Sequence, residues 1–304
     1  MTGDADGAGG VNPPDAGPAG RAAGGRAAAA IGRALHIHVR GPWPFITLRS
    51  YALAGRHFVW HARADRKGLE GSARAQAAGP VWRRPIYNRS IAALFALGSL
   101  LFMLGAALSL LPAGAGPPAA AINMIFAAGS VPFTLAAYLQ HFQAANAPEF
   151  TPDPATRPGR QRISLIGWHP RSAGWWSTIT QFVGTIDFNF NTFDALRAPD
   201  GWLAQDLVIW VPGMLGSIMF LVSSYLAFIE TSHRYWSWQP ANLDWQIVAA
   251  NLAGSVAFMT ASTLAYVPPG PTAAWIGDVA NVHLFVGGLG FLVGAALMFR
   301  ESRQ

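Results

Sequence analysis

Long apolar runs restrict the fold of this chain more than any other feature. Each run is about 20 residues long, which is enough for a helix to cross a hydrocarbon core about 30 Å thick. The runs lie at 91–112, 119–140, 207–229, 246–267 and 278–299. Because 52% of the residues are hydrophobic and only 12% are charged, the chain lacks the polar surface that five such helices would need in a soluble protein. The runs therefore predict an integral membrane protein.

A sixth segment, 175–196, has the length of a membrane span but not the composition. It carries Asp187, Asn189, Asn191 and Asp194, so its hydropathy alone does not place it in a bilayer. Two interpretations are open. The segment crosses the membrane as a polar helix packed against other helices, or it lies at the surface as an amphipathic helix with its polar side in water.

A short motif occurs once in each of the six segments, including the polar one. It consists of Gly, then Ser, Thr or Gly, then two variable residues and Phe. The glycine and phenylalanine pairs are Gly98 and Phe102, Gly129 and Phe133, Gly184 and Phe188, Gly216 and Phe220, Gly254 and Phe258, and Gly287 and Phe291. Residues four apart share a helix face, and a small residue there lets a second helix approach closely. We interpret the motif as a helix-packing signature, not as a ligand site.

The distribution of basic residues also favours six spans. If 175–196 crosses the membrane, 20 of the 21 Lys and Arg residues lie on one side and only Arg197 lies on the other. Basic residues are enriched in cytoplasmic loops. We therefore expect six transmembrane helices, arranged as three related hairpins, with both termini in the cytoplasm of a bacterial cell and the bundle in its inner membrane.

The segments before the first apolar run differ from the rest of the chain. Residues 1–32 are rich in Gly, Ala and Pro, which predicts a disordered tail. Residues 1–90 hold 13 of the 21 Lys and Arg residues and 5 of the 15 Asp and Glu residues, so the segment 33–90 is basic, and we expect it to contact anionic lipid head groups or a partner protein. Within this segment, LHIHVR alternates as a strand does. His57 and His61 have the spacing of a metal pair on a helix, but no carboxylate completes a site, so we expect no metal.

These features divide the chain into a membrane part and its connections. The expected segments are a tail at 1–32, a basic cytoplasmic segment at 33–90, hairpins at 91–140, 175–229 and 246–304, and cytoplasmic linkers at 141–174 and 230–245. The resulting fold class is all-α.

Two stretches resemble a known family. Tyr87-Asn88-Arg89-Ser90 leading into ALFALGSLLFMLG resembles the YrhK-like membrane domain, a two-helix unit with a Gly-Ser-x-x-Phe core. SWQPANLDWQIVAANLAGSVAFMTASTLAYVPP with NVHLFVGGLGFLVGAALMFRE resembles longer bacterial proteins that carry several such units. The resemblance begins near residue 80 and is weak at 175–196. It implies an integral membrane protein and brings no activity, catalytic residue or cofactor with it.

Several classes of function are excluded or disfavoured. The chain has no Cys, which excludes a thiol nucleophile and a thiolate-bound metal. It also has no phosphate-binding glycine loop, no G-x-S-x-G elbow and no H-E-x-x-H motif, so we expect neither an enzyme nor a cofactor. The basic residues gather beside apolar runs, which favours a membrane surface over nucleic acid.

Polar side chains inside the apolar segments are the candidate functional residues. A carboxylate near the middle of a bilayer costs about 2.5–3.5 kcal/mol, so it usually faces other helices or water. The residues that could line a pathway for a polar solute or an ion are Gln181, Asp187, Asn191, Asp194 and His283. The alternative function is a scaffold or sensor that transports nothing and acts through its basic N-terminal segment. Either could form a homo-oligomer.

Overall fold

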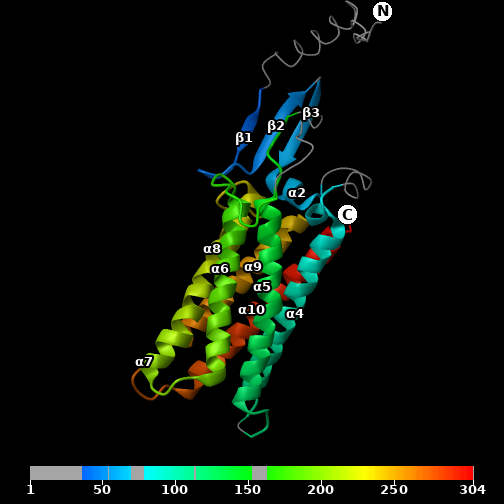
Figure 1. Cartoon of the computed structure of the whole chain (residues 1–304). Coiled ribbons are helices and arrows are strands. Elements are labelled where there is room, and N and C mark those ends of the chain that lie inside the picture. The colour runs from blue at the N-terminus through cyan, green and yellow to red at the C-terminus, as the bar shows by residue number, and fades with distance from the viewer. Residues whose placement is uncertain (1–35, 54, 70–78, 113, 153–162, 304) are drawn as a thin grey trace, which may run out of the picture.

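The computed structural model describes residues 36–53, 55–69, 79–112, 114–152 and 163–303. Within these ranges, six long helices stand side by side in a bundle, and a small sheet projects from one end of it (Figure 1). The long helices are α4 (Pro85–Ser109), α5 (Ala119–Ala145), α6 (Ala173–Asp194), α8 (Val211–Ser232), α9 (Leu243–Leu264) and α10 (Ala274–Glu301). The tail expected at 1–32 lies outside the described residues.

Five of these helices are long and apolar enough to cross a membrane. They are α4, α5, α9, α10 and a continuous helix, Trp202–Ser232, in which α7 (Trp202–Gln205) and the π-helical η4 (Asp206–Trp210) lead into α8. Apolar side chains near the middle of these helices, such as Leu100, Val131 and Val256, are exposed on the outside of the bundle. Such an outer surface matches a lipid environment. The protein is an integral membrane protein, as the apolar runs predict.

The polar segment forms helix α6, which packs lengthwise between α5 and α8. Its hydropathy falls short of the other five helices, in keeping with its sequence. It nevertheless exposes Val183 and Phe190, which are 42% and 58% exposed. The outer side of α6 therefore carries apolar residues as its neighbours do, but it also carries the half-buried Asp187, one turn from Val183.

The six helices form a closed ring in chain order. Each long helix contacts the next one along the chain, and α10 returns to contact α4. Consecutive helices form three pairs, which are α4 with α5, α6 with α8, and α9 with α10. In each pair the two backbones come close together at the motif glycines. A Cβ added to Gly98 would lie 2.9 Å from the carbonyl oxygen of Gly129. A Cβ added to Gly216 would also lie 2.9 Å from the carbonyl oxygen of Gly184, and one added to Gly254 would lie 2.9 Å from that of Gly287.

The phenylalanine of each motif covers the glycine of the partner helix. Phe133 packs against Gly98, for example, and Phe102 packs against Gly129. The same reciprocal contact occurs in the other two pairs. Because the side chain missing from one helix is replaced by the ring of its partner, two backbones meet closely without leaving a void.

The second position of the motif serves a different contact, between one helix pair and the next. Ser130 of α5 accepts a hydrogen bond from Thr192 of α6, at 3.2 Å. Ser217 of α8 and Ser262 of α9 lie 2.5 Å apart. In α10 this position is Gly288, which adjoins the backbone of α4 at Ser99. The first glycine of the motif thus joins the helices within a pair, and a small residue at the second position, a serine at two junctions and Gly288 at the third, joins one pair to the next.

The N-terminal part of the chain is not helical, so the all-α class is wrong for it. Strands β1 (His38–Arg40), β2 (Leu48–Leu53) and β3 (Arg56–His61) form an antiparallel sheet in the order β1-β2-β3 (Figure 1). The alternation in LHIHVR correctly indicates the first strand. The sheet is followed by α2 (Ala62–Lys67) and η1 (Val81–Arg83), which connect it to the bundle.

His57 and His61 both lie on β3 and not on a helix. At about 3.3 Å per strand residue they are about 13 Å apart along the strand, which is too far for a shared metal ion. Aromatic residues explain the preference for a strand here. Tyr51 stacks on Phe58 at 5.5 Å, and Phe150 from the α5–α6 connection packs on Tyr51 at the same distance.

Replacing Gly98 by Ala tests the glycine contact. The added methyl group would collide with the backbone of α5, so we expect a loss of about 1–3 kcal/mol in stability. The matched control is Gly277→Ala in α10, because nothing lies within 4 Å of a Cβ added there. Thermal unfolding of the purified protein in detergent measures both, and equal melting temperatures for the two variants would contradict the packing role of Gly98.

Candidate functional site

The axis of the bundle is the candidate functional site. We call the end that carries the sheet and Glu301 the inner end, and the end that carries the short connections between the helices of each pair the outer end. An outer cavity of about 200 Å³, a central space of about 10 Å³ and an inner cavity of about 50 Å³ lie along this axis. Each is lined by several helices of the ring, so together they follow the line on which a solute would cross.

Six phenylalanines, one from each helix, fill the middle of the axis. They are the motif residues Phe102, Phe133, Phe188, Phe220, Phe258 and Phe291. Neighbouring rings have centroids 5.1 to 6.3 Å apart, which joins all six into one phenylalanine cluster. A single water needs about 10–15 Å³, so the central space holds at most one.

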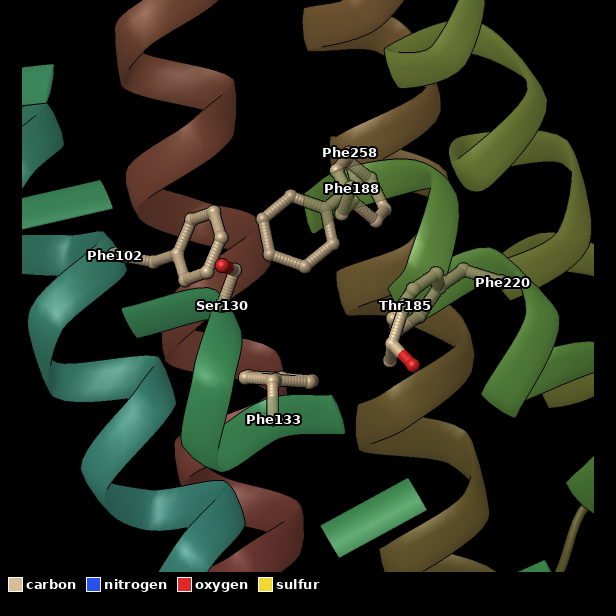
Figure 2. A pocket seen from close by; sticks show the side chains of 7 residues that line it. All are labelled: Phe102, Ser130, Phe133, Thr185, Phe188, Phe220 and Phe258. Atoms are coloured by element: carbon tan, nitrogen blue, oxygen red, sulfur yellow. The ribbon is translucent and has the colours of Figure 1, made fainter. Parts of the chain in front are cut away.

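The central space is apolar as well as small. Figure 2 shows that five of the rings line it together with Ser130 and Thr185. Both hydroxyls donate to carbonyls of their own helices, Ser130 to Ala127 at 2.9 Å and Thr185 to Phe182 at 2.7 Å. Neither hydroxyl is therefore left to hold a solute, and the phenylalanine cluster separates the two larger cavities.

The outer cavity is lined by neutral residues. Among the described residues that surround it, the polar ones are Asn123, Asn191, Thr192, Ser262 and Asn281. Asn191 donates to the carbonyl of Ile209 at 2.8 Å, and Asn123 donates to the carbonyl of Ala195 at 2.8 Å. The cavity thus offers amide and hydroxyl groups but carries no charge of its own.

The inner cavity is lined by charged and amide side chains. The short helix α2 contributes Arg63, Arg66 and Lys67. The long helices contribute the polar residues Gln140, Gln143, Ser177, Thr178, Gln181, Ser223, Ser224, Glu230 and Asn251. The cavity lies where α2 crosses the inner end of the ring, so α2 covers it.

Ion pairs hold α2 in this position. Arg66 binds both oxygens of Glu230 at the end of α8, at 2.5 and 3.0 Å. Arg63 binds Glu301 at the end of α10, at 2.6 Å, and Lys67 binds the other oxygen of the same carboxylate. The two glutamates are almost fully buried. A buried charge that loses its partner is strongly destabilising, so these pairs fix α2 to the bundle.

Polar contacts on the other side of α2 complete its attachment. Asp65 accepts a hydrogen bond from Arg83 at 3.0 Å. Asn88 at the start of α4 donates to the carbonyl of Lys67 at 2.9 Å, and Gln143 donates to Asn88 at 3.0 Å. Cations and backbone of α2 are thus bonded directly to α4, α8 and α10, and α5 is linked to them through Asn88.

The pKa values of Arg63 and Lys67, two buried cations of α2, shift in opposite directions. Burial alone would lower the pKa of Arg63, but the nearby carboxylates, Glu301 first, outweigh it and raise the pKa above its usual value. For Lys67, burial and the repulsion from Arg63 dominate and lower the pKa from 10.5 to about 8. Lys67 is the only lysine in the sequence, which makes its titration observable.

Two of the residues expected to line a pathway lie in the walls of the axial cavities. Gln181 lines the inner cavity and Asn191 lines the outer one. Both lie on α6, on opposite sides of the phenylalanine cluster along the axis. The expectation that α6 supplies polar groups to the interior of the bundle therefore agrees with the geometry of these two residues.

The other three candidates lie outside the cavities. Asp187 is half-buried on the side of α6 that also carries the exposed Val183, so it does not face the axis as expected. Asp194 is exposed where α6 ends. His283 contacts the carbonyl of Val279 in its own helix through Nδ1, at 2.8 Å. His283 is not among the residues that line the outer cavity, although its neighbours Asn281 and Leu284 are.

The sequence analysis missed the ionic contacts of α2. Glu230 and Glu301 each stand at the end of an apolar run, where a lone carboxylate needs a partner. The stretch Arg63-Ala64-Asp65-Arg66-Lys67 is the densest group of charges in the described chain and supplies those partners. This pattern could have indicated the pairing, but not which cation meets which carboxylate.

Comparison of the chain with known protein families, with characterised proteins and with solved structures finds no match.

The low pKa of Lys67 predicts a dependence of stability on pH. Between about pH 8 and pH 10.5 the folded chain binds fewer protons at Lys67 than the unfolded chain does, so stability rises with pH in this range. The contribution is complete above pH 10.5 and is lost as the pH falls towards 8. Lys67→Met should abolish the rise, whereas Arg300→Met, at an exposed residue near the same end, should keep it. Thermal unfolding across this range measures the slopes, and equal slopes in wild type and Lys67→Met would contradict the assignment.

Proposed function

We propose that this protein is a non-enzymatic, multi-pass protein of a bacterial inner membrane that lets small polar solutes or ions cross along the axis of a six-helix bundle. One observation carries the proposal: cavities with polar linings lie at both ends of the axis, and a cluster of six phenylalanines separates them. An apolar constriction of this kind excludes hydrated solutes by dewetting, as in gated channels. The conformation described is the closed one.

Six spans are supported by the position of the two ends of the bundle. Arg63 and Lys67 precede the first long helix, and Glu301 ends the last one, yet the three side chains are in contact. An even number of crossings is needed to return the chain to the same end. We therefore include α6 among the spans, with both termini on the cytoplasmic side, where the basic residues lie.

The resemblance to YrhK-like proteins is part of the proposal. It is supported by the motif, which occurs in all six helices and makes an equivalent contact in each of the three pairs. We infer that the bundle consists of three related hairpins and that each corresponds to one two-helix unit of that family.

A scaffold or sensor that acts through the basic segment has less support. Four of its cations, Arg63, Arg66, Lys67 and Arg83, bind carboxylates of the protein itself. They are therefore not free to bind anionic lipid or a partner. The sheet retains exposed basic residues such as Arg40 and Arg56 for that purpose.

Opening the phenylalanine cluster tests the pathway. Phe220 is nearly fully buried in the cluster, and Phe220→Ser replaces an apolar ring by a small polar side chain. Burial of a Phe side chain is worth about 1.5–3 kcal/mol, so a barrier lowered by a comparable amount would raise flux at least about tenfold. Swelling of proteoliposomes in isosmotic potassium chloride, sodium gluconate and urea, with an ionophore for the counter-ion, measures it.

The matched control is Phe190→Ser. Phe190 lies on α6, another long helix of the ring, but its side chain faces outward and is 58% exposed. Its replacement should therefore leave flux unchanged. Both variants must first elute as folded protein by size-exclusion chromatography. If a folded Phe220→Ser variant passed none of the three solutes, the protein would not be a pathway.

A reporter fusion tests the sixth span. If α6 crosses the membrane, the connection after Arg197 is periplasmic, so a green fluorescent protein fused there should stay dark and an alkaline phosphatase should be active. The same reporters fused after Arg234, between α8 and α9, should give the opposite result. Fluorescence from the fusion after Arg197 would show that α6 does not span.

A further inference from the structure

We propose that the outer cavity binds a small uncharged solute that both donates and accepts hydrogen bonds, such as a short polyol or a simple amide, and that the pathway passes such solutes in preference to ions. The second part rests on the proposed function, whereas the binding site does not. The inference starts from the balance of charge along the axis and from the amide side chains that line the two cavities.

Charges along the axis are balanced within the protein. Among the described residues that line the outer cavity and the central space, none is charged. The inner cavity is bordered by three cations, and three carboxylates lie beside them. The ion pairs are Arg66 with Glu230, Arg63 with both Glu301 and Asp244, and Lys67 with Glu301. Neither a cation nor an anion therefore finds an unpaired opposite charge here.

An ion on this axis would lose its hydration without a replacement. Removing a charge from water is strongly unfavourable unless an opposite charge or several polar groups take the place of water. Channels that conduct ions supply rings of carbonyls or of charged side chains for this purpose. The described residues of the central space are phenylalanines with Ser130 and Thr185, whose hydroxyls donate to their own helices. An uncharged solute gives up a weaker hydration shell and crosses such a region at a lower cost.

The outer cavity offers both kinds of hydrogen-bonding group. Asn123 and Asn191 each use the amide nitrogen to donate to a backbone carbonyl, at 2.8 Å in both cases. Their side-chain oxygens accept no hydrogen bond from the described residues, so both remain acceptors. Asn281 of α10 lines the same cavity, and its amide, which can donate and accept, makes no hydrogen bond to those residues. Polar groups inside proteins normally have partners, and a solute in the cavity supplies them.

The size and the lining of the outer cavity define the class of solute. Its volume is about 200 Å³. A cavity of about 150 Å³ holds a benzene molecule, so a solute of up to about six non-hydrogen atoms fits. Apolar side chains, among them Phe102, Phe126 and Leu284, form the rest of the lining. They suit the carbon skeleton of a short polyol or amide, while the asparagines bind its polar atoms.

Amides without protein partners recur on the other side of the phenylalanine cluster. Gln140 of α5, Gln181 of α6 and Asn251 of α9 line the inner cavity, and none of the three side chains makes a hydrogen bond to the described residues. Each amide can both donate and accept. The inner cavity, at about 50 Å³, has room for water in the conformation described. Uncharged hydrogen-bonding groups thus line the axis on both sides of the barrier.

The test of the binding site compares two solutes of the same size and shape. Acetamide and acetate differ in charge and in hydrogen-bond donors but have the same number of non-hydrogen atoms. Saturation-transfer NMR, which detects weak binding through the protons of the ligand, is measured on the wild type in deuterated detergent. Acetamide and glycerol should show saturation transfer, and acetate and methylammonium should not. Equal transfer to acetate and acetamide would overturn the preference for an uncharged solute, and no transfer to acetamide or glycerol would overturn the site.

The variant Asn281→Leu places the binding in the outer cavity. It preserves the approximate size of the side chain and breaks no hydrogen bond to the described residues, so the fold should be retained. The affinity for acetamide should fall about two- to tenfold, which corresponds to the loss of one hydrogen bond. The matched control is Thr263→Val on α9, at an exposed residue outside the lining, whose hydroxyl bonds only to its own helix. Unchanged affinity in Asn281→Leu would overturn the site.

Selectivity is measured on proteoliposomes that contain the Phe220→Ser variant. Swelling in glycerol should be at least about tenfold faster than with the wild type, whereas the conductance in potassium chloride should stay at the level of the wild type. A variant that conducted potassium or chloride as readily as it passed glycerol would overturn the selectivity and leave the pathway intact. If neither glycerol nor ions crossed, the pathway would fail, and the NMR comparison would decide the binding site by itself.

Discussion

Close contact between glycine backbones is the constraint on which this structure depends. Helices in lipid gain nothing from hydrophobic attraction to each other, so they associate through dispersion contacts that need short distances between backbones. Each helix pair achieves this where Gly meets Gly and a phenylalanine of one helix covers the glycine of the other. Since the ring must lie beside the crossing point, the same contact that joins two helices also directs a phenylalanine towards the axis.

The repeated motif therefore both packs the helices together and forms the apolar barrier on the axis. The glycine contacts of the three pairs lie at a similar level along the bundle axis, so the six rings meet in its middle. Polar residues of α6 lie on the inner and outer sides of these rings. Gln181 lies two turns before Phe188 and faces the inner cavity, whereas Asn191 lies one turn after it and faces the outer cavity. The small-residue motif thus determines where water is excluded, and the sequence between motifs determines what each cavity offers.

Much of the bundle could be predicted from the sequence because its signals are local. Helix length, the motif and the side of the membrane favoured by basic residues all follow from spacing and composition. The convergence of the phenylalanines could not be read in the same way, since it depends on how three pairs close into a ring. The expectation that Asp187 lines the axis is wrong for a related reason: periodicity places Asp187 and Gly184 on adjoining parts of one helix face, but only the neighbouring helices decide which part turns inward. The contacts of α2 with Glu230 and Glu301 join residues more than 160 positions apart, and no local pattern specifies them.

The two kinds of contact in the ring also indicate where it can open. Within a pair, the glycine contacts are so short that sliding would bring backbone atoms into collision, so we expect each pair to move as a unit. Between the second and third pairs, the contacts include side-chain hydroxyls, Ser217 with Ser262 and Ser224 with Ser255, whereas Gly288 lies against α4 between the third and first pairs. A hydroxyl can exchange one partner for another or for water with little change in energy. Separation of the second pair from the third would draw their phenylalanines apart without disrupting the glycine contacts within each pair. Because α2 binds Glu230 of the second pair and Glu301 of the third, its ion pairs oppose that separation.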